Sequence, residues 1–168
     1  MSIIRTNQIT NTAGDASPII PGCVLQVVQG GRTSRATVSG TTFTDIGVSA
    51  SITPKSTTSK ILVTVSGMLS NNTNNGYYSL LKLFRNDTEI GSGTGASNYN
   101  SFVAHLMTAS YETNGFSQQH LDSPNSISEI TYKLKLSAHV NSIAVVGGRG
   151  DTNDHAVPTT ITLMEIGG

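Results

Sequence analysis

The sequence has no tryptophan, only one cysteine and few charged or aromatic residues. A single cysteine, Cys23, cannot form an internal disulfide, which excludes the class of small secreted domains held together by disulfides. We expect Cys23 to be a small buried apolar residue; the alternative is a reactive or intermolecular thiol. Stability must therefore come from a hydrophobic core, and 168 residues are enough for one such domain.

Charge is scarce and balanced. Charged residues make up 12% of the chain, about half the usual share, and ten basic residues match ten acidic ones. Without a basic stripe, nucleic acid and anionic membranes are poor candidates for partners. The apolar runs are too short to insert in a bilayer, and the start "MSIIRTNQITNTAG" lacks the features of a signal peptide, so we do not expect general secretory export.

Residues 1–22 differ in character from the rest of the chain. They are polar, show no periodicity and end in "SPIIPG", where Pro18 and Pro21 favour extended conformations in the residues before them. We therefore predict two parts, an extended N-terminal arm over residues 1–22 and a head domain over residues 23–168.

From residue 24 onward the pattern is that of β-strands, with runs such as "VLQVV", "KILVTVSGML", "YYSLLKLFR" and "TTITLMEI". The clearest alternation is "ITYKLKLSAHV", whose apolar face should lie in the core: Tyr132, Leu134, Leu136, Ala138 and Val140. The loop "NNTNNG" at 71–76 and the two Asn-x-Thr sequons, at Asn71 and Asn86, are typical of turns.

About eight to ten short strands separated by turn signals predict an all-β fold, an antiparallel two-sheet sandwich of the jelly-roll kind. Helices should be nearly absent. Residues 101–111 are the one segment whose apolar residues also fit a helical spacing, so a helix is the alternative there.

Several stretches in order resemble a family of bacteriophage virion proteins known from viruses of cyanobacteria and other aquatic bacteria. These stretches are "PGCVLQVVQ", "VSASITPKSTTSKILVTVS", "LLKLFRNDTEIGSGTGAS", "LDSPNSISEITYKLKL" and "TTITLMEIGG". They span most of residues 21–168, and the segment "RTNQITNTAGDASP" is similar to the leaders that precede such heads.

The resemblance implies a jelly-roll head similar in plan to tumour-necrosis-factor-like domains, usually a homotrimer, used as a tail fibre or capsid decoration of the virion. It implies docking on other phage structural proteins through residues 1–22. Because little precedes the head, we expect a short appendage rather than a long fibre. A threefold axis would also bury apolar sheet faces and shield edge strands.

The sequence offers weak candidates for chemistry. His120, Asp122 and Ser123 lie close together, but no nucleophile-elbow motif accompanies them, and "DSP" is typical of a strand end followed by a turn. Hard oxygen ligands gather near the end of the chain, where Ca²⁺ is the alternative to an ordinary loop: Asp151, Asn153, Asp154 and His155. The glycine-rich "GSGTGAS" lacks the ending of a phosphate loop. We predict no enzymatic activity, no metal and no cofactor.

Four tyrosines lie beside polar loops and offer a candidate sugar-binding platform: Tyr77, Tyr78, Tyr99 and Tyr111. Packing of these rings over the rim of the sandwich is the competing interpretation, and it is the one we favour. A host-surface carbohydrate is therefore the alternative partner, which would make the protein a receptor-binding adhesin.

The stretch "GGRGDTND" at 147–154 contains Arg149-Gly150-Asp151, the tripeptide that adhesion proteins present to integrins. Its glycines lead us to predict a chain reversal between the last two strands. Neither the missing signal peptide nor the phage resemblance favours an animal-cell partner. We expect Arg149 and Asp151 instead to face a neighbouring subunit.

Overall fold

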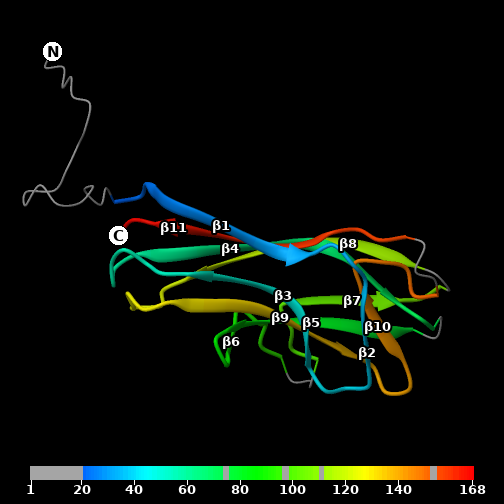
Figure 1. Cartoon of the computed structure of the whole chain (residues 1–168). Coiled ribbons are helices and arrows are strands. Elements are labelled where there is room, and N and C mark those ends of the chain that lie inside the picture. Colours follow the sequence, from blue (N-terminus) through cyan, green and yellow to red (C-terminus); the bar gives the residue numbers. More distant parts are fainter. Residues whose placement is uncertain (1–20, 74–75, 96–98, 110–111, 152–154) are drawn as a thin grey trace, which may run out of the picture.

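The computed structural model describes residues 21–73, 76–95, 99–109, 112–151 and 155–168. These residues form eleven strands in two antiparallel sheets that pack face to face (Figure 1). They contain no helix, and hence none long and apolar enough to cross a membrane. The predicted all-β sandwich is confirmed, and residues 103–107, where a helix was the alternative, are a strand. Residues 1–20 of the predicted arm lie outside the described residues.

Sheet A is built around β4 (Lys60–Asn71). One edge of β4 pairs with β8 (Thr113–Asp122), and the other pairs first with β11 (Thr159–Ile166) and then with β10 (Ile143–Val146). Outside these, β1 (Val24–Arg32) pairs with β11, and β2 (Ala36–Ser39) pairs with β10. The sheet is therefore four strands wide. β11 and β10 share the position next to β4, and β1 and β2 share the position beyond them.

Sheet B is built in the same way around β5 (Tyr77–Arg85). One edge of β5 pairs with β9 (Ile130–Ala138), which in turn pairs with β3 (Thr44–Ile52). The other edge pairs with β7 (Val103–Met107) and β6 (Thr88–Ile90). This sheet is also four strands wide.

The pairing order is that of a jelly roll. Early strands pair with late ones in nested order: β1 with β11, β3 with β9, β4 with β8, and β5 with β7. Successive pairs alternate between sheet A and sheet B. A hairpin-like ribbon of four antiparallel pairs, wrapped so that its pairs alternate between two sheets, is the eight-position jelly-roll architecture.

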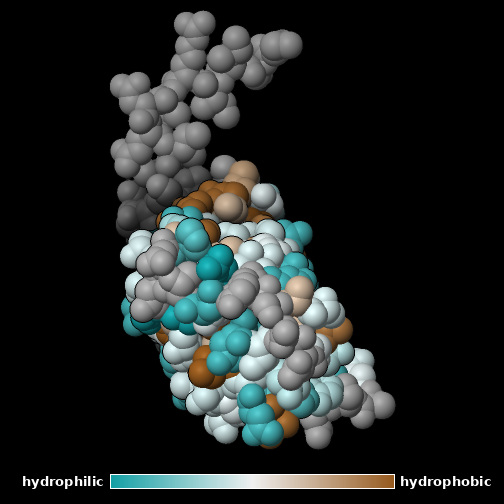
Figure 2. All heavy atoms as spheres, turned by 90° about the vertical axis from the view of Figure 1, so that its right-hand side faces the viewer, coloured by the Kyte–Doolittle hydropathy of each residue, from teal (hydrophilic) through white to brown (hydrophobic). Residues whose placement is uncertain are grey.

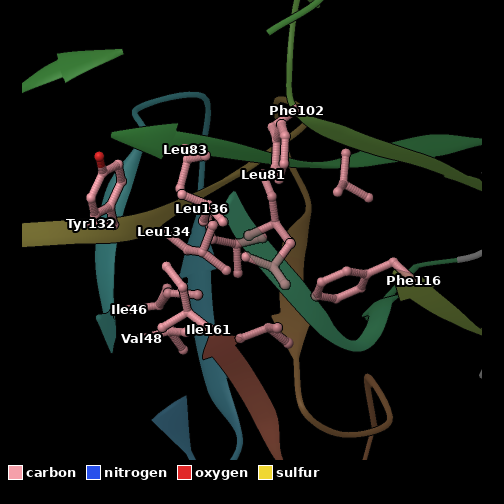
Figure 3. Close-up of a cluster of buried hydrophobic side chains, with 14 of the residues drawn as sticks. Ile46, Val48, Leu81, Leu83, Phe102, Phe116, Tyr132, Leu134, Leu136 and Ile161 are labelled. Atoms are coloured by element: carbon pink, nitrogen blue, oxygen red, sulfur yellow. The ribbon is translucent and has the colours of Figure 1, made fainter. Parts of the chain in front are cut away.

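The core lies between the sheets because each strand turns alternate side chains inward. Figure 3 shows these inward side chains from both sheets meeting: Ile46, Val48, Leu81, Leu83, Phe102, Phe116, Tyr132, Leu134, Leu136 and Ile161. Four of the five predicted core residues of "ITYKLKLSAHV" are buried, Tyr132 to Ala138. Val140 was predicted wrongly: it is 53% exposed, because β9 ends at Ala138 and the alternation ends with it.

The sandwich has two distinct ends. At one, which we call the terminal end, β1 begins and β11 finishes, with Val24 opposite Ile166. The described part of the chain both enters and leaves the head there (Figure 1). At the other, the far end, β4 finishes at Asn71, β5 begins at Tyr77 and β9 finishes at Ala138.

Cys23 is exposed, so the expectation of a buried residue was wrong. It stands just before β1, and its carbonyl oxygen accepts a hydrogen bond of 2.9 Å from the backbone N–H of Gly167. The backbone of Cys23 is thus held against the C-terminal residues. Its side chain is exposed because Cys23 precedes β1, where the alternation of inward and outward side chains begins.

Candidate functional site

Four rings form an aromatic cluster at the far end: Tyr77, His139, Tyr99 and Tyr78. Tyr77 and His139 stack with ring centroids 4.7 Å apart and planes 11° from parallel. His139 and Tyr99 lie 6.4 Å apart at 14°, and Tyr99 and Tyr78 lie 5.3 Å apart at 29°. The rings therefore follow one another in a near-parallel series.

Strand pairing brings the cluster together. Tyr77 and Tyr78 open β5, and the neighbouring β9 runs antiparallel to it and ends one residue before His139. The backbone N–H of His139 donates to the carbonyl oxygen of Tyr78 at 3.2 Å. A turn follows, with Asn141 in the left-handed region at φ 62°. The sequence prediction missed His139, because only the pairing of β5 with β9 brings its ring to Tyr77.

The geometry supports both interpretations of the tyrosines. Stacking within the series covers the ring faces that a sugar would need, as rim packing predicts. Tyr99 is nevertheless 46% exposed, so part of its ring and its hydroxyl remain accessible at the far end. Tyr111, the fourth tyrosine of the predicted platform, lies outside the described residues.

The tripeptide Arg149-Gly150-Asp151 is engaged within the protein. Arg149 donates to Asp151 through Nε at 2.6 Å and Nη2 at 2.9 Å. These hydrogen bonds hold the pKa of the Asp151 carboxyl below its usual value. Gly150 is buried, and its carbonyl oxygen accepts from Arg35 Nη2 at 2.9 Å. The opposite charges of Arg149 and Asp151 are paired with each other here.

The stretch 147–154 does not join two antiparallel strands. Both β10 and β11 run antiparallel to β4 along the same edge, so they point the same way. The chain does double back locally, since Gly148 forms an antiparallel bridge with Ala156, and the Gly147 N–H donates to Met68 while its carbonyl accepts from Val157. Residues 152–154 lie outside the described residues. The glycines permit close packing: a Cβ on Gly150 would overlap the backbone carbonyl of Asn71.

In the group His120, Asp122 and Ser123, the carboxylate of Asp122 is bound by residues outside the group. His120 and Asp122 share the inner face of β8, as alternation predicts. However, both carboxylate oxygens of Asp122 accept from Arg85 Nη1 at 3.0 Å, and Oδ2 also accepts from the Tyr132 hydroxyl at 2.7 Å. Ser123 is exposed beyond the strand end. Asp122 thus links β8 of sheet A to β5 and β9 of sheet B.

Metal ligands and surface grooves were the other features considered as candidate sites. Within the described ranges no three His, Cys, Asp or Glu side chains group as metal ligands, while Asn153 and Asp154 of the predicted loop lie outside those ranges. A shallow groove of about 320 Å³ runs between β7 and β8, the open edges of the two sheets. His105 lines it, and partial burial lowers the pKa of this imidazole, opposed by the nearby Glu112 carboxylate.

The remaining polar segments behave as turns. In the first sequon the Asn71 side-chain oxygen accepts from the backbone N–H of Thr73 at 3.1 Å. In the second, Asn86 adopts φ 52° between β5 and β6. Gly91 opens the glycine-rich segment with φ 69°, and the next element among the described residues is the strand β7 rather than a helix that could hold a phosphate.

Comparisons with known proteins find similarity in structure and none in sequence. No protein-family model matches the sequence, and no curated protein matches it significantly. The fold is similar to part of a chain in a structure of infectious bursal disease virus, Gx strain, with a TM-score of 0.44 and 11% sequence identity. The match covers 85% of this chain and 36% of the viral chain, so this protein spans about a third of that chain's length.

Proposed function

We propose that the protein is a structural component of a bacteriophage particle, a homotrimeric head that docks on the virion through its N-terminal arm. The observation that carries this proposal is the jelly-roll strand order, found in the same residues that resemble phage virion proteins. The fold alone hosts many functions, so the assignment depends on that combination.

The hydrogen bonds of the polar side chains support a structural role. Asp122, the carboxylate of the catalytic group considered from the sequence, accepts hydrogen bonds from Arg85 and Tyr132. The protein would act by shape complementarity and multivalency. Three weak contacts presented on one rigid assembly bind together more tightly than one, by roughly 10² or more.

The geometry also separates attachment from display. Residue 21 enters at the terminal end, whereas the aromatic cluster and the loop of Arg149 lie toward the far end (Figure 1). An arm bound to the particle would therefore leave the far end directed away from the arm.

Removing residues 1–20 should abolish attachment to the particle while leaving the head folded, because β1 and the core begin after this segment. Full-length and shortened proteins would be added to particles that lack the endogenous protein, and bound protein quantified after sedimentation of the particles. Circular dichroism of the shortened protein is the control for folding. Unchanged decoration by the shortened protein would refute docking through the arm.

A second candidate function is binding of a host-surface carbohydrate, favoured by the exposed part of the aromatic cluster at the far end. Aromatic rings with hydroxyl groups recognise sugars by stacking on their apolar faces and donating hydrogen bonds. In this role the trimer would present three such clusters together.

Tyr99→Ala should weaken glycan binding about tenfold, the loss expected from removing one ring contact. Phe84→Ala is the matched control, since Phe84 lies on the outer face of sheet B under Lys135 and outside the cluster. Glycan arrays probed with the full chain provide the measurement. Absence of binding by the unmodified protein, or equal loss in both variants, would leave the structural role alone.

A further inference from the structure

The outer face of sheet A has an apolar row that crosses all four strands. The register places Val27 opposite Met164, Met164 opposite Leu62, and Leu62 opposite Leu121. All four alternate with buried or half-buried positions and so point outward. Val27 is 57% exposed and Leu121 50% exposed, at the two edges of the row.

The same face has almost no charge. Among the outward positions of β1, β11, β4 and β8, Lys60 is the one charged residue, and it lies at the terminal end opposite Ile166. The next rows toward the far end contain hydroxyl, amide and glycine groups only: Gln29, Thr162, Thr64 and Gln119, then Gly31, Thr160, Ser66 and Ser117.

The outer face of sheet B is built differently. Lysines occupy its central strands, and two of them pair with carboxylates, Lys82 with Glu89 at 2.7 Å and Lys133 with Asp87 at 3.2 Å. The third, Lys135, lies 4.2 Å from the ring centre of Phe84. Such a face is suited to water. Depletion of charge on one face only is what distinguishes the centre of a protein interface from the rest of a surface.

Four polar side chains on the sheet A face are paired within it. Gln29 Nε2 donates to Thr162 Oγ1 at 2.9 Å, and Ser66 and Thr160 share a hydrogen bond of 2.9 Å between their hydroxyls. Groups that keep these partners lose less on removal from water than unpaired ones. The rows beside the apolar one can therefore enter a contact at modest cost.

We propose that this face is where copies of the chain meet. The inference names the contact surface of the oligomer in the proposed function, and rests on that function for the number of copies. Turned toward a threefold axis, three faces with almost no charge bring few like charges together, and closed symmetry covers the exposed edge strands β1 and β8. Figure 2 shows hydrophobic surface along the upper side of the head, where sheet A lies.

The face supplies the central part of such a contact. Four strands at about 4.8 Å spacing and some eight residues at about 3.4 Å each give a plane of roughly 500 Å² on each copy. Each copy in a trimer has two neighbours, so three such faces give roughly 500 Å² per contact, and the edge strands β1 and β8 would supply the rest of the roughly 1,000 Å² of a specific interface. The row from Val27 to Leu121 would supply its apolar centre.

The test measures the mass of the full chain in solution by sedimentation velocity. The unmodified protein should be an oligomer, and Val27→Glu or Leu121→Glu should weaken association at least about thirtyfold, because either change places an unpaired carboxylate in the apolar row. Val140→Glu is the matched control, since Val140 is 53% exposed but lies at the far end. Thermal melting should show all three variants folded, because the altered side chains are already exposed.

Two outcomes would overturn the proposal, and they differ in their consequence for the proposed function. A monomeric unmodified protein would show that another segment or partner covers the face, and would also remove the oligomer from the proposed function. An oligomer that survives both face variants would place the contact elsewhere and leave the proposed function intact. Loss of particle attachment by an intact oligomer would affect the docking proposal alone.

Discussion

Asp122→Ala is expected to lower the free energy of unfolding by about 3 kcal/mol, since it removes the acceptor that joins the two sheets. The substitution would leave the Arg85 guanidinium and the Tyr132 hydroxyl without the carboxylate that both contact. Tyr132 is fully buried, so its hydroxyl could not turn to water instead. Arg85 retains 29% exposure of its side chain, which reduces the loss below that of a fully buried ion pair.

The Tyr132 hydroxyl remains a donor across the accessible pH range. Burial is the main cause that raises the pKa of Tyr132, and the Asp122 carboxylate raises it further. The phenol therefore stays protonated at any pH where the protein would be studied, and its loss of a partner cannot be relieved by ionisation.

Urea unfolding followed by circular dichroism would measure the change, with Asp87→Ala as the control. Asp87 also pairs with a cation, Lys133, at 3.2 Å, but its side chain is 94% exposed. Exposed pairs of this kind contribute little, so this variant should resemble the unmodified protein within about 0.5 kcal/mol. Similar losses in the two variants would contradict a buried link between the sheets at Asp122.

Gly30→Ala is expected to destabilise the head by about 3 kcal/mol, the upper range for inserting one methyl group into a packed interior. Gly30 lies on β1 of sheet A, and a Cβ there would overlap the carbonyl oxygen of Ser49 on β3 of sheet B. It would also approach the Ala50 Cβ at 3.2 Å. Both obstacles are backbone or short side chains, so only movement of a strand could make room.

Gly93→Ala is the control for the general effect of replacing glycine. A Cβ on Gly93 would have no neighbour within 4 Å, and the residue does not adopt a left-handed conformation. Its unfolding midpoint should therefore shift little, by the equivalent of about 0.5 kcal/mol or less. An undisturbed Gly30→Ala variant would mean that β1 does not approach β3 as closely as the structure shows.

The alternation in the sequence predicted strands and their inward faces well, because a half-buried strand imposes a period of two on its own residues. Tyr132, Leu134 and Leu136 were assigned correctly for this reason. The prediction failed at Val140 and Cys23, where a strand has ended or not begun. Periodicity states which face a residue takes and gives no signal for where pairing stops.

Features that depend on the partner strand could not be predicted. The aromatic cluster requires β5 to lie beside β9, and the apolar row requires β1, β11, β4 and β8 to align in register. Each member of the row is an ordinary outward residue in its own strand. The same limit applies at 147–154, where the glycines predicted that the chain doubles back but could not show that both flanking strands follow one edge of β4.

The most direct test of a virion role is electron microscopy of purified phage particles labelled with antibodies against the folded head. The proposal predicts label at a fixed position on every intact particle, on the tail or over the capsid, together with the protein in the particle fraction. Unlabelled particles, with the protein confined to the soluble fraction of infected cells, would contradict it.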